Sequence, residues 1–173
     1  MTEAPESTGE RALPPYNKPL PEPTAVSQPF WDAAKEHRLV LQRSKKTGKF
    51  VYYPRNVSPF GPNDELEWQE VSGRGKVYSY TVARRPTAPQ WANDGPYVIA
   101  IVELDEGPHL TANILGCAPD EVRIGMAVVA SFEDVTAEVT LVQFRPAPDG
   151  AVSPAGAPDS STGVESDSSV ANQ

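Results

Sequence analysis

The sequence predicts a mainly β protein: a five-stranded barrel preceded by one short helix. Three observations lead to this prediction. From residue 66 onward, runs rich in β-branched and aromatic residues recur, with Gly- and Pro-containing turns between them. A clear helical spacing of apolar residues occurs in one segment, 30–37. Prolines gather near the start of the chain, and the final stretch is poor in bulky apolar residues, so we expect the fold to occupy the middle.

The two terminal segments have compositions that are typical of disorder. Seven of the 19 prolines precede residue 30, and the run Pro-Leu-Pro-Glu-Pro at 19–23 favours an extended polyproline conformation. Residues 147–173 are mainly Ala, Pro, Ser, Asp and Gly, which bury too little surface to offset their chain entropy. We therefore expect a disordered Pro-rich arm over 1–26 and a disordered acidic tail over 147–173.

Charge and cysteine content limit the classes of protein to which this sequence can belong. The net charge is −8, and most of it lies in the two terminal segments, so the folded part is nearly neutral and offers no broad basic footprint for a nucleic acid. With Cys117 as the only cysteine, no intramolecular disulfide forms, which fits a reducing compartment. The N-terminus lacks a signal-peptide pattern and no apolar run has membrane-spanning length. These features predict a cytoplasmic protein without a membrane span.

The segment 27–65 reads as a helix followed by a small ribbon. Ser27 is a candidate N-cap and Pro29 fits the first turn of a helix through 30–37. Two short strands, 39–43 and 49–53, flank a turn in which Gly48 suits a left-handed conformation. A loop rich in Pro and Gly follows over 54–64.

The segment 66–146 contains the barrel. Gly73 and Gly75 lead into a long strand and suggest a turn or bulge that bends it. After a first strand at 67–71, the expected barrel strands are 76–85, 97–105, 110–116, 127–134 and 138–145, with one helical turn at 119–122. Five strands with a helical break before the last two match the Greek-key barrel of the OB type.

A search for catalytic constellations gives none. His37 is expected at a helix C-terminus and His109 at a strand start after a turn, where structural roles are the simpler interpretation. Cys117 has no evident base beside it to make it a nucleophile. We predict no catalytic residue in this chain on its own.

One alternative from the residues is a module that binds single-stranded nucleic acid. Tyr78, Tyr80 and Trp91 lie near Arg84 and Arg85, and simple strand alternation puts Tyr78 and Tyr80 on one face. The acidic chain argues against this function, and the same face also suits a core or a protein interface.

Several motifs, in order, resemble a known family. They are Phe-Trp in the helix, Leu-Val-Leu-Gln-Arg (39–43), Phe-Val-Tyr-Tyr-Pro-Arg (50–55), Val-Ser-Gly-Arg-Gly-Lys-Val-Tyr-Ser-Tyr-Thr-Val (71–82), Pro-Tyr-Val-Ile-Ala-Ile-Val-Glu-Leu-Asp-Glu-Gly (96–107) and Phe-Glu-Asp-Val (132–135). In sequence and spacing the chain is similar, from about residue 29 to 146, to the zinc-ribbon/OB-fold proteins associated with acyl-CoA metabolism.

The resemblance implies a zinc ribbon whose ligands are lost. At the positions that match the family's two cysteine pairs, this chain has Ser44, Thr47, Ser58 and Gly61. Neutral hydroxyls and a glycine do not replace thiolates as zinc ligands, so we expect a metal-free, degenerate ribbon. Such a ribbon is held by its strands and by packing of Phe50, Tyr52 and Phe60, or it is loose.

The resemblance also implies a function. Family members look like accessory subunits of thiolases, hydroxymethylglutaryl-CoA synthase and steroid side-chain aldolases of the lipid-transfer-protein type. We therefore expect a non-catalytic subunit that binds such an enzyme and helps to form its acyl-CoA channel, with the CoA thioester as substrate of the complex and no cofactor on this chain. The interface or channel candidates are Trp31, Tyr52, Tyr53, Trp91 and Tyr97, and the CoA phosphate candidates are Lys45, Lys46, Arg55, Arg84 and Arg85. A stand-alone acyl-CoA binding protein or thioesterase is the second hypothesis.

Overall fold

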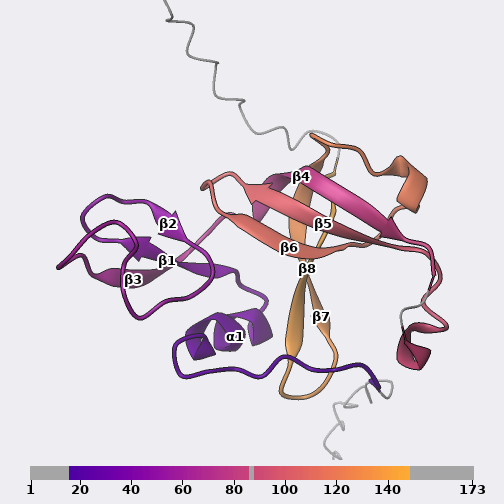
Figure 1. Ribbon diagram of the computed structural model, residues 1–173, viewed down its shortest axis with the longest axis horizontal. Coiled ribbons are helices and arrows are strands. Elements are labelled where there is room, and N and C mark those ends of the chain that lie inside the picture. The colour runs from indigo at the N-terminus through magenta and orange to yellow at the C-terminus, as the bar shows by residue number, and fades with distance from the viewer. Residues whose placement is uncertain (1–15, 86–87, 149–173) are drawn as a thin grey trace, which may run out of the picture.

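The computed structural model describes residues 16–85 and 88–148, and it confirms a mainly β fold with a closed barrel (Figure 1). Its elements, in chain order, are α1 (Gln28–Lys35), β1 (Val40–Ser44), β2 (Phe50–Val51), β3 (Leu66–Glu70), β4 (Arg74–Ala83), the 3-10 helix η1 (Pro89–Trp91), β5 (Tyr97–Leu104), β6 (His109–Ile114), the 3-10 helix η2 (Pro119–Glu121), β7 (Ala127–Asp134) and β8 (Thr140–Pro146).

Helix α1 begins at Gln28 with Pro29 in its first turn, as the Ser27 N-cap position predicts, but it ends at Lys35, two residues before the predicted end at 37. Phe30, Ala33 and Ala34 are buried, as their spacing predicts. Ser27 occupies the N-cap position, but its side chain makes no capping hydrogen bond. The Ser27 hydroxyl instead accepts the Thr24 backbone N–H at 2.9 Å, so the turn before the helix takes the oxygen that we expected to cap it.

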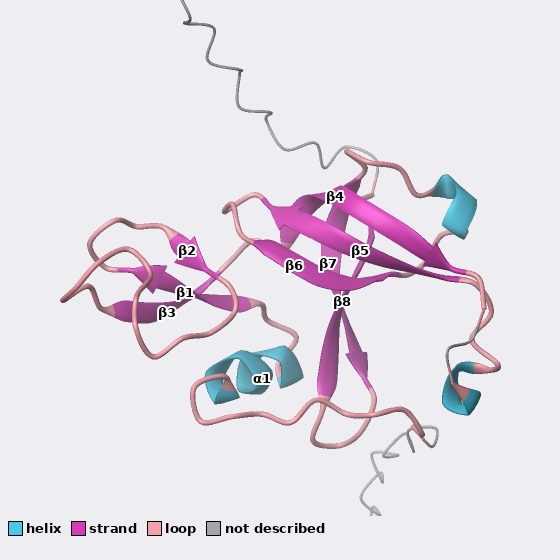
Figure 2. Ribbon diagram, in the orientation of Figure 1, coloured by secondary structure: helices cyan, strands magenta, loops and turns pink. Residues whose placement is uncertain are grey.

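A three-stranded ribbon sheet in the order β2-β1-β3 lies beside the barrel (Figure 2). Gly48 in the β1–β2 turn has a φ of +71°, the left-handed conformation predicted for it. Strand β3, which our prediction groups with the barrel, pairs antiparallel with β1 from Val40↔Glu70 to Ser44↔Leu66. A strand needs backbone partners, and β3 finds them in the ribbon.

The barrel closes in the order β4-β5-β6-β8-β7, with β7 pairing back onto β4. All neighbouring pairs are antiparallel except β6 and β8, which run parallel at Ile114↔Phe144. The backbone ladder continues past β8, because the Ala147 N–H donates to the Ala127 carbonyl oxygen at 2.9 Å. Closure satisfies the backbone groups of both outer strands.

A β-bulge in β4 separates two tyrosines that we expected on one face. The register shifts between Val77 and Ser79, so that Ser79 pairs with Ile101 and Tyr80 with Ala100. Tyr78 instead stacks on His109, with ring centroids 4.5 Å apart. The extra residue of the bulge breaks the alternation on which that prediction depended.

The barrel interior and the inner face of the ribbon share one apolar core. Val77, Val102 and Phe144 are fully buried inside the barrel, and Phe30 and Leu41 extend the same cluster to α1 and β1. Burial of side chains of this size stabilises the fold by about 1.5–3 kcal/mol each. Helix α1 packs on both β1 and β8, and so fixes the ribbon against the outside of the barrel.

Residues 16–26, which we expected to lack order, lie along the molecule. In Figure 1 this segment runs from α1, past the end of the β7–β8 hairpin, towards η1. Lys18 Nζ lies 2.7 Å from Asp94 Oδ2, which ties the segment to the loop after η1. The rest of the predicted arm, 1–15, and residues 149–173 of the predicted tail lie outside the described residues.

Candidate functional site

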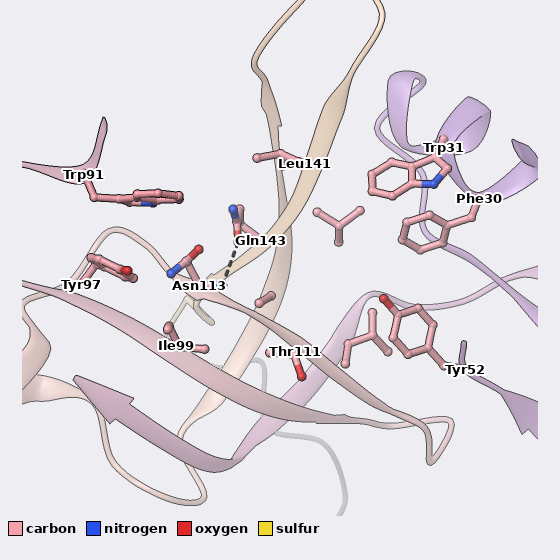
Figure 3. Close-up of a pocket in the computed structure, with 13 residues that line it drawn as sticks. Phe30, Trp31, Tyr52, Trp91, Tyr97, Ile99, Thr111, Asn113, Leu141 and Gln143 are labelled. Atoms are coloured by element: carbon pink, nitrogen blue, oxygen red, sulfur yellow. Dashed lines mark hydrogen bonds between the residues drawn. The ribbon is translucent and has the colours of Figure 1, made fainter. Parts of the chain in front are cut away.

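An aromatic groove lies on the outer face of the barrel, between α1 and η1. Its floor is formed by outward-facing residues of β5, β6 and β8, and its volume is about 400 Å³. Phe30, Trp31 and Tyr52 stand on one side and Trp91 and Tyr97 on the other, as Figure 3 shows. A concave, mostly apolar space with a few polar groups is the usual form of a binding site.

The groove brings together four of the five aromatic residues that the sequence singled out. Trp31, Tyr52, Trp91 and Tyr97 all line it, although they come from four separate elements or loops. Tyr53 does not line it: this side chain is 62% exposed and stacks on Tyr52 with ring centroids 4.3 Å apart.

Two amide side chains that sequence reasoning missed form the polar part of the floor. The Asn113 backbone N–H donates to Gln143 Oε1 at 2.7 Å, and Asn113 Nδ2 donates to the Val98 carbonyl oxygen at 2.9 Å. Gln143 is 8% exposed. Within the described ranges 16–85 and 88–148, Gln143 Nε2 has no acceptor and Asn113 Oδ1 no donor, so the floor offers the N–H groups of Gln143 Nε2 as donors and Asn113 Oδ1 as an acceptor.

The Tyr52 hydroxyl is neutral under ordinary conditions. Burial raises the pKa of Tyr52 to about 12, because the phenolate would lose hydration in this apolar surrounding. Phe30 contacts Tyr52 at 6.1 Å between ring centroids and meets Trp31 edge-on at 5.1 Å. This side of the groove is therefore an uncharged aromatic surface.

The basic candidates do not form one patch. Lys45 Nζ pairs with Glu65 at 2.7 Å and Lys46 Nζ donates to the Pro62 carbonyl oxygen at 3.2 Å, both at the tip of the ribbon. Arg84 pairs with Asp120 at 3.5 Å, and it follows the end of β4, on the opposite side of the molecule (Figure 1). Arg55 and Arg85 are exposed.

The surroundings of His37 and Cys117 fit structural roles better than catalytic ones. His37 Nε2 lies 3.1 Å from both carboxylate oxygens of Asp134, and its ring stacks on Phe132. Burial, with a smaller contribution from Glu121, raises the pKa of the Cys117 thiol, which disfavours the reactive thiolate.

Three of the four positions that match zinc ligands, Ser44, Thr47 and Ser58, take part in a hydrogen-bond network. The Ser44 hydroxyl accepts the Thr47 backbone N–H at 2.9 Å, and the Ser58 hydroxyl accepts the Phe60 N–H at 3.2 Å. Ser58 donates to the Asp64 carboxylate, which also accepts the Lys46 backbone N–H at 3.1 Å. Hydrogen bonds from the Ser58 and Ser44 hydroxyls hold the pKa of Asp64 below its usual value.

These residues do not fit a zinc ion. A structural zinc site needs four soft or nitrogen donors in a tetrahedron, and the lost positions supply hydroxyls and the side-chain-free Gly61. In the part of the chain that the structure describes, no three His, Cys, Asp or Glu side chains are grouped as metal ligands would be. The same residues contain no helix with the length and apolar character needed to cross a bilayer.

Two family models match the chain in the order of its two modules. A ChsH2 rubredoxin-like zinc ribbon domain matches residues 31–57, and a ChsH2 C-terminal OB-fold domain matches residues 68–133. The first covers the end of α1 through β2, and the second covers most of the barrel.

Similar proteins carry related names. The "probable enoyl-CoA hydratase alpha subunit" of Thermomonospora curvata is 43% identical over 119 residues, which are 68% of this chain and 37% of that protein. This chain thus spans little more than a third of that relative's length. A "DUF35 domain-containing scaffold protein" of Methanocaldococcus jannaschii is 41% identical over 109 residues, which are 61% of this chain and 75% of that protein.

The solved structure of an "Ltp2-ChsH2(DUF35) aldolase" contains a chain with the same fold. It superposes with a TM-score of 0.67 at 38% identity, covering 73% of this chain and 98% of that one. With both modules matched in order and the similarity extending over most of the M. jannaschii relative, this chain belongs to the DUF35 family, in which a ChsH2-type ribbon precedes an OB-fold barrel.

Proposed function

We propose that this chain is a non-catalytic accessory subunit that binds a thiolase-type or lipid-transfer-protein-type aldolase enzyme and helps to form its acyl-CoA channel. The observation that carries the proposal is the aromatic groove, where Trp31, Tyr52, Trp91 and Tyr97 converge on an outer barrel face. The names of relatives support the class of complex: one is a hydratase alpha subunit, one a scaffold protein and one an aldolase.

The groove has the composition of an interface centre or of an apolar passage. Trp and Tyr are enriched where protein partners bind tightly, and an acyl chain prefers the same uncharged surface. Ile99 on the floor is 36% exposed, which leaves an apolar surface available to a partner or substrate.

Arg84 and Arg85 are the basic candidates that fit this proposal best. Tyr97, at one end of the groove, pairs with Ala83, the residue before Arg84. A CoA thioester whose acyl end lies in the groove would place phosphates within the reach of side chains at this end of β4. Lys45, Lys46 and Arg55 belong to the ribbon and would have to serve a separate contact.

A test uses the tagged full-length chain, purified from cells that contain its native partners, with co-purifying proteins identified by mass. We expect a near-stoichiometric thiolase-fold or aldolase-type protein. Recovery of the chain alone, as a monomer or homo-oligomer, would contradict the subunit function.

Matched variants then locate the interface. Ile99 and Ile101 are neighbouring outward positions of β5, 36% and 38% exposed, but only Ile99 lines the groove. We expect Ile99→Asp to weaken partner binding at least about tenfold, which corresponds to about 1.4 kcal/mol, and Ile101→Asp to have a smaller effect. Equal losses for the two variants would place the interface elsewhere.

Direct action on an acyl-CoA is the second candidate, and the free amide atoms of Asn113 and Gln143 favour it. A donor and an acceptor on an apolar floor can orient a polar group of a ligand. Turnover of a panel of acyl-CoA thioesters by the pure chain would establish it, whereas activity that appears only with the partner supports the subunit function.

A further inference from the structure

We propose that the Asp64 carboxylate takes the structural place of the metal ion in this ribbon, cross-linking its two turns so that the ribbon folds without a metal. The first turn joins β1 to β2 and contains Ser44 and Lys46; the second contains Ser58. We call the Asp64 carboxylate with its donors, the Ser58 hydroxyl and the Lys46 backbone N–H, the Asp64 clamp.

The clamp reaches one turn through a side chain and the other through the backbone. Ser58 accepts the N–H of Phe60 within its own turn and donates to Asp64, while the backbone N–H of Lys46 in the first turn also donates to Asp64. The carboxylate therefore joins the two turns by one hydrogen bond to each.

A carboxylate suits the centre of this arrangement. It has about four lone-pair sites, so it can accept both donors at once, and hydrogen bonds to an ionised acceptor are the stronger kind. A metal cation between the same neutral hydroxyls would have no thiolate to bind, whereas an anion finds hydrogen atoms on both turns.

Burial makes the clamp necessary rather than incidental. Ser58 is 7% exposed, so water cannot readily replace the carboxylate as its acceptor. The clamp also fixes the loop between β2 and β3, which holds the exposed side chains of Tyr53, Val57 and Phe60 outward.

The neighbouring residue provides a matched control. Glu65 is an acid at the next position, its side chain is 74% exposed, and its carboxylate pairs with the exposed Lys45. Asp64→Ala removes the clamp, and Glu65→Ala removes a similar charge from the same loop without touching Ser44 or Ser58.

The experiment measures metal content and backbone hydrogen exchange by mass spectrometry on the full chain. We expect the purified wild-type protein to contain zinc far below one ion per chain, and a chelator to leave its exchange unchanged. Asp64→Ala should speed exchange about tenfold or more in peptides over 44–49 and 56–61, relative to Glu65→Ala, with the barrel peptides unaffected.

Three results would overturn the proposal: one zinc per wild-type chain, faster exchange of the wild-type ribbon in chelator, or equal exchange in Asp64→Ala and Glu65→Ala. If Asp64→Ala does not fold, Asp64→Asn replaces it, because the amide oxygen still accepts the Lys46 N–H but the charge is gone. We expect Asp64→Asn to speed exchange in both turns by a smaller factor, and wild-type exchange there would also overturn the proposal.

Discussion

The Asn113 backbone N–H donates to the side chain of Gln143 across 2.7 Å, at the place where β6 and β8 run parallel. These strands share one paired position, Ile114↔Phe144, so a side chain from β8 takes over the next step of the ladder. Gln143 thereby adds a hydrogen bond where the two barrel strands share a single paired position, and the same residue forms part of the groove floor.

Loss of this side chain should destabilise the barrel. Gln143→Ala leaves the part-buried Asn113 N–H without its acceptor, which costs about 1–3 kcal/mol. Chemical denaturation of the variant measures the change in the free energy of unfolding. Gln69→Ala is the control, since Gln69 is exposed and bonds to the half-buried Arg43, and we expect it to stay within about 0.5 kcal/mol of wild type. A Gln143→Ala protein as stable as Gln69→Ala would contradict this role.

Acid should weaken the contact between His37, two residues beyond the end of α1, and Asp134 of β7. Hydrogen bonds from Thr140 and then His37 lower the pKa of Asp134 in the folded state. A lowered carboxyl pKa gives stability that is present above the unfolded value, about 3.9, and is lost as pH falls through the folded value. We therefore expect the stability difference between wild type and Asp134→Asn, measured by thermal unfolding, to shrink below about pH 4. A stability difference between wild type and Asp134→Asn that stays constant from about pH 3 to about pH 7 would rule out this linkage.

Tyr52 should ionise later than an exposed tyrosine. Its pKa is raised to about 12 by burial in the groove. An ultraviolet titration of wild type minus Tyr52→Phe isolates this hydroxyl, and we expect its transition near pH 12 if the fold persists there. Titration near pH 10, the value of a free tyrosine, would show that the side chain is solvated and that the groove is open at this end.

Gly75 should not tolerate a side chain. A Cβ at this position would lie 2.3 Å from the Glu103 carbonyl oxygen on the paired strand β5. Gly75→Ala then forces β4 and β5 apart, at a cost of about 1–3 kcal/mol in unfolding free energy. Thr81→Ala, at an exposed position of the same strand, is expected to cost less than about 1 kcal/mol. Equal denaturant midpoints for Gly75→Ala and Thr81→Ala would refute the steric argument.

The sequence was sufficient for the elements and for four of the aromatic residues that line the groove. Periodicity located the barrel strands to within two or three residues at most ends, since their inward positions such as Val98, Ala100 and Val102 alternate strictly. Aromatic residues stand out by type alone, and four of the predicted ones converge because α1, η1 and β5 surround one face.

The remaining parts depend on pairings that no local pattern shows. Asp64 looks like any loop carboxylate until the fold places it between Ser58 and the Lys46 backbone N–H. Asn113 and Gln143 become a pair only because β6 and β8 run parallel, a long-range choice. The bulge beside Tyr78 inserts one residue without a Gly at that point, so strand alternation gave the wrong face.

Closure of the barrel limits the strand edges through which copies of this chain could associate. Because β4 and β7 pair, the open strand edges among the described residues belong to the ribbon sheet, at β2 and β3. Strand β2 is two residues long and offers few backbone groups with which a strand of another chain could pair. Strand β3 is longer but carries Glu67 and Glu70, and two such edges meeting would bring like charges together. The ribbon thus repels the edge-to-edge association that leads small β proteins into aggregates.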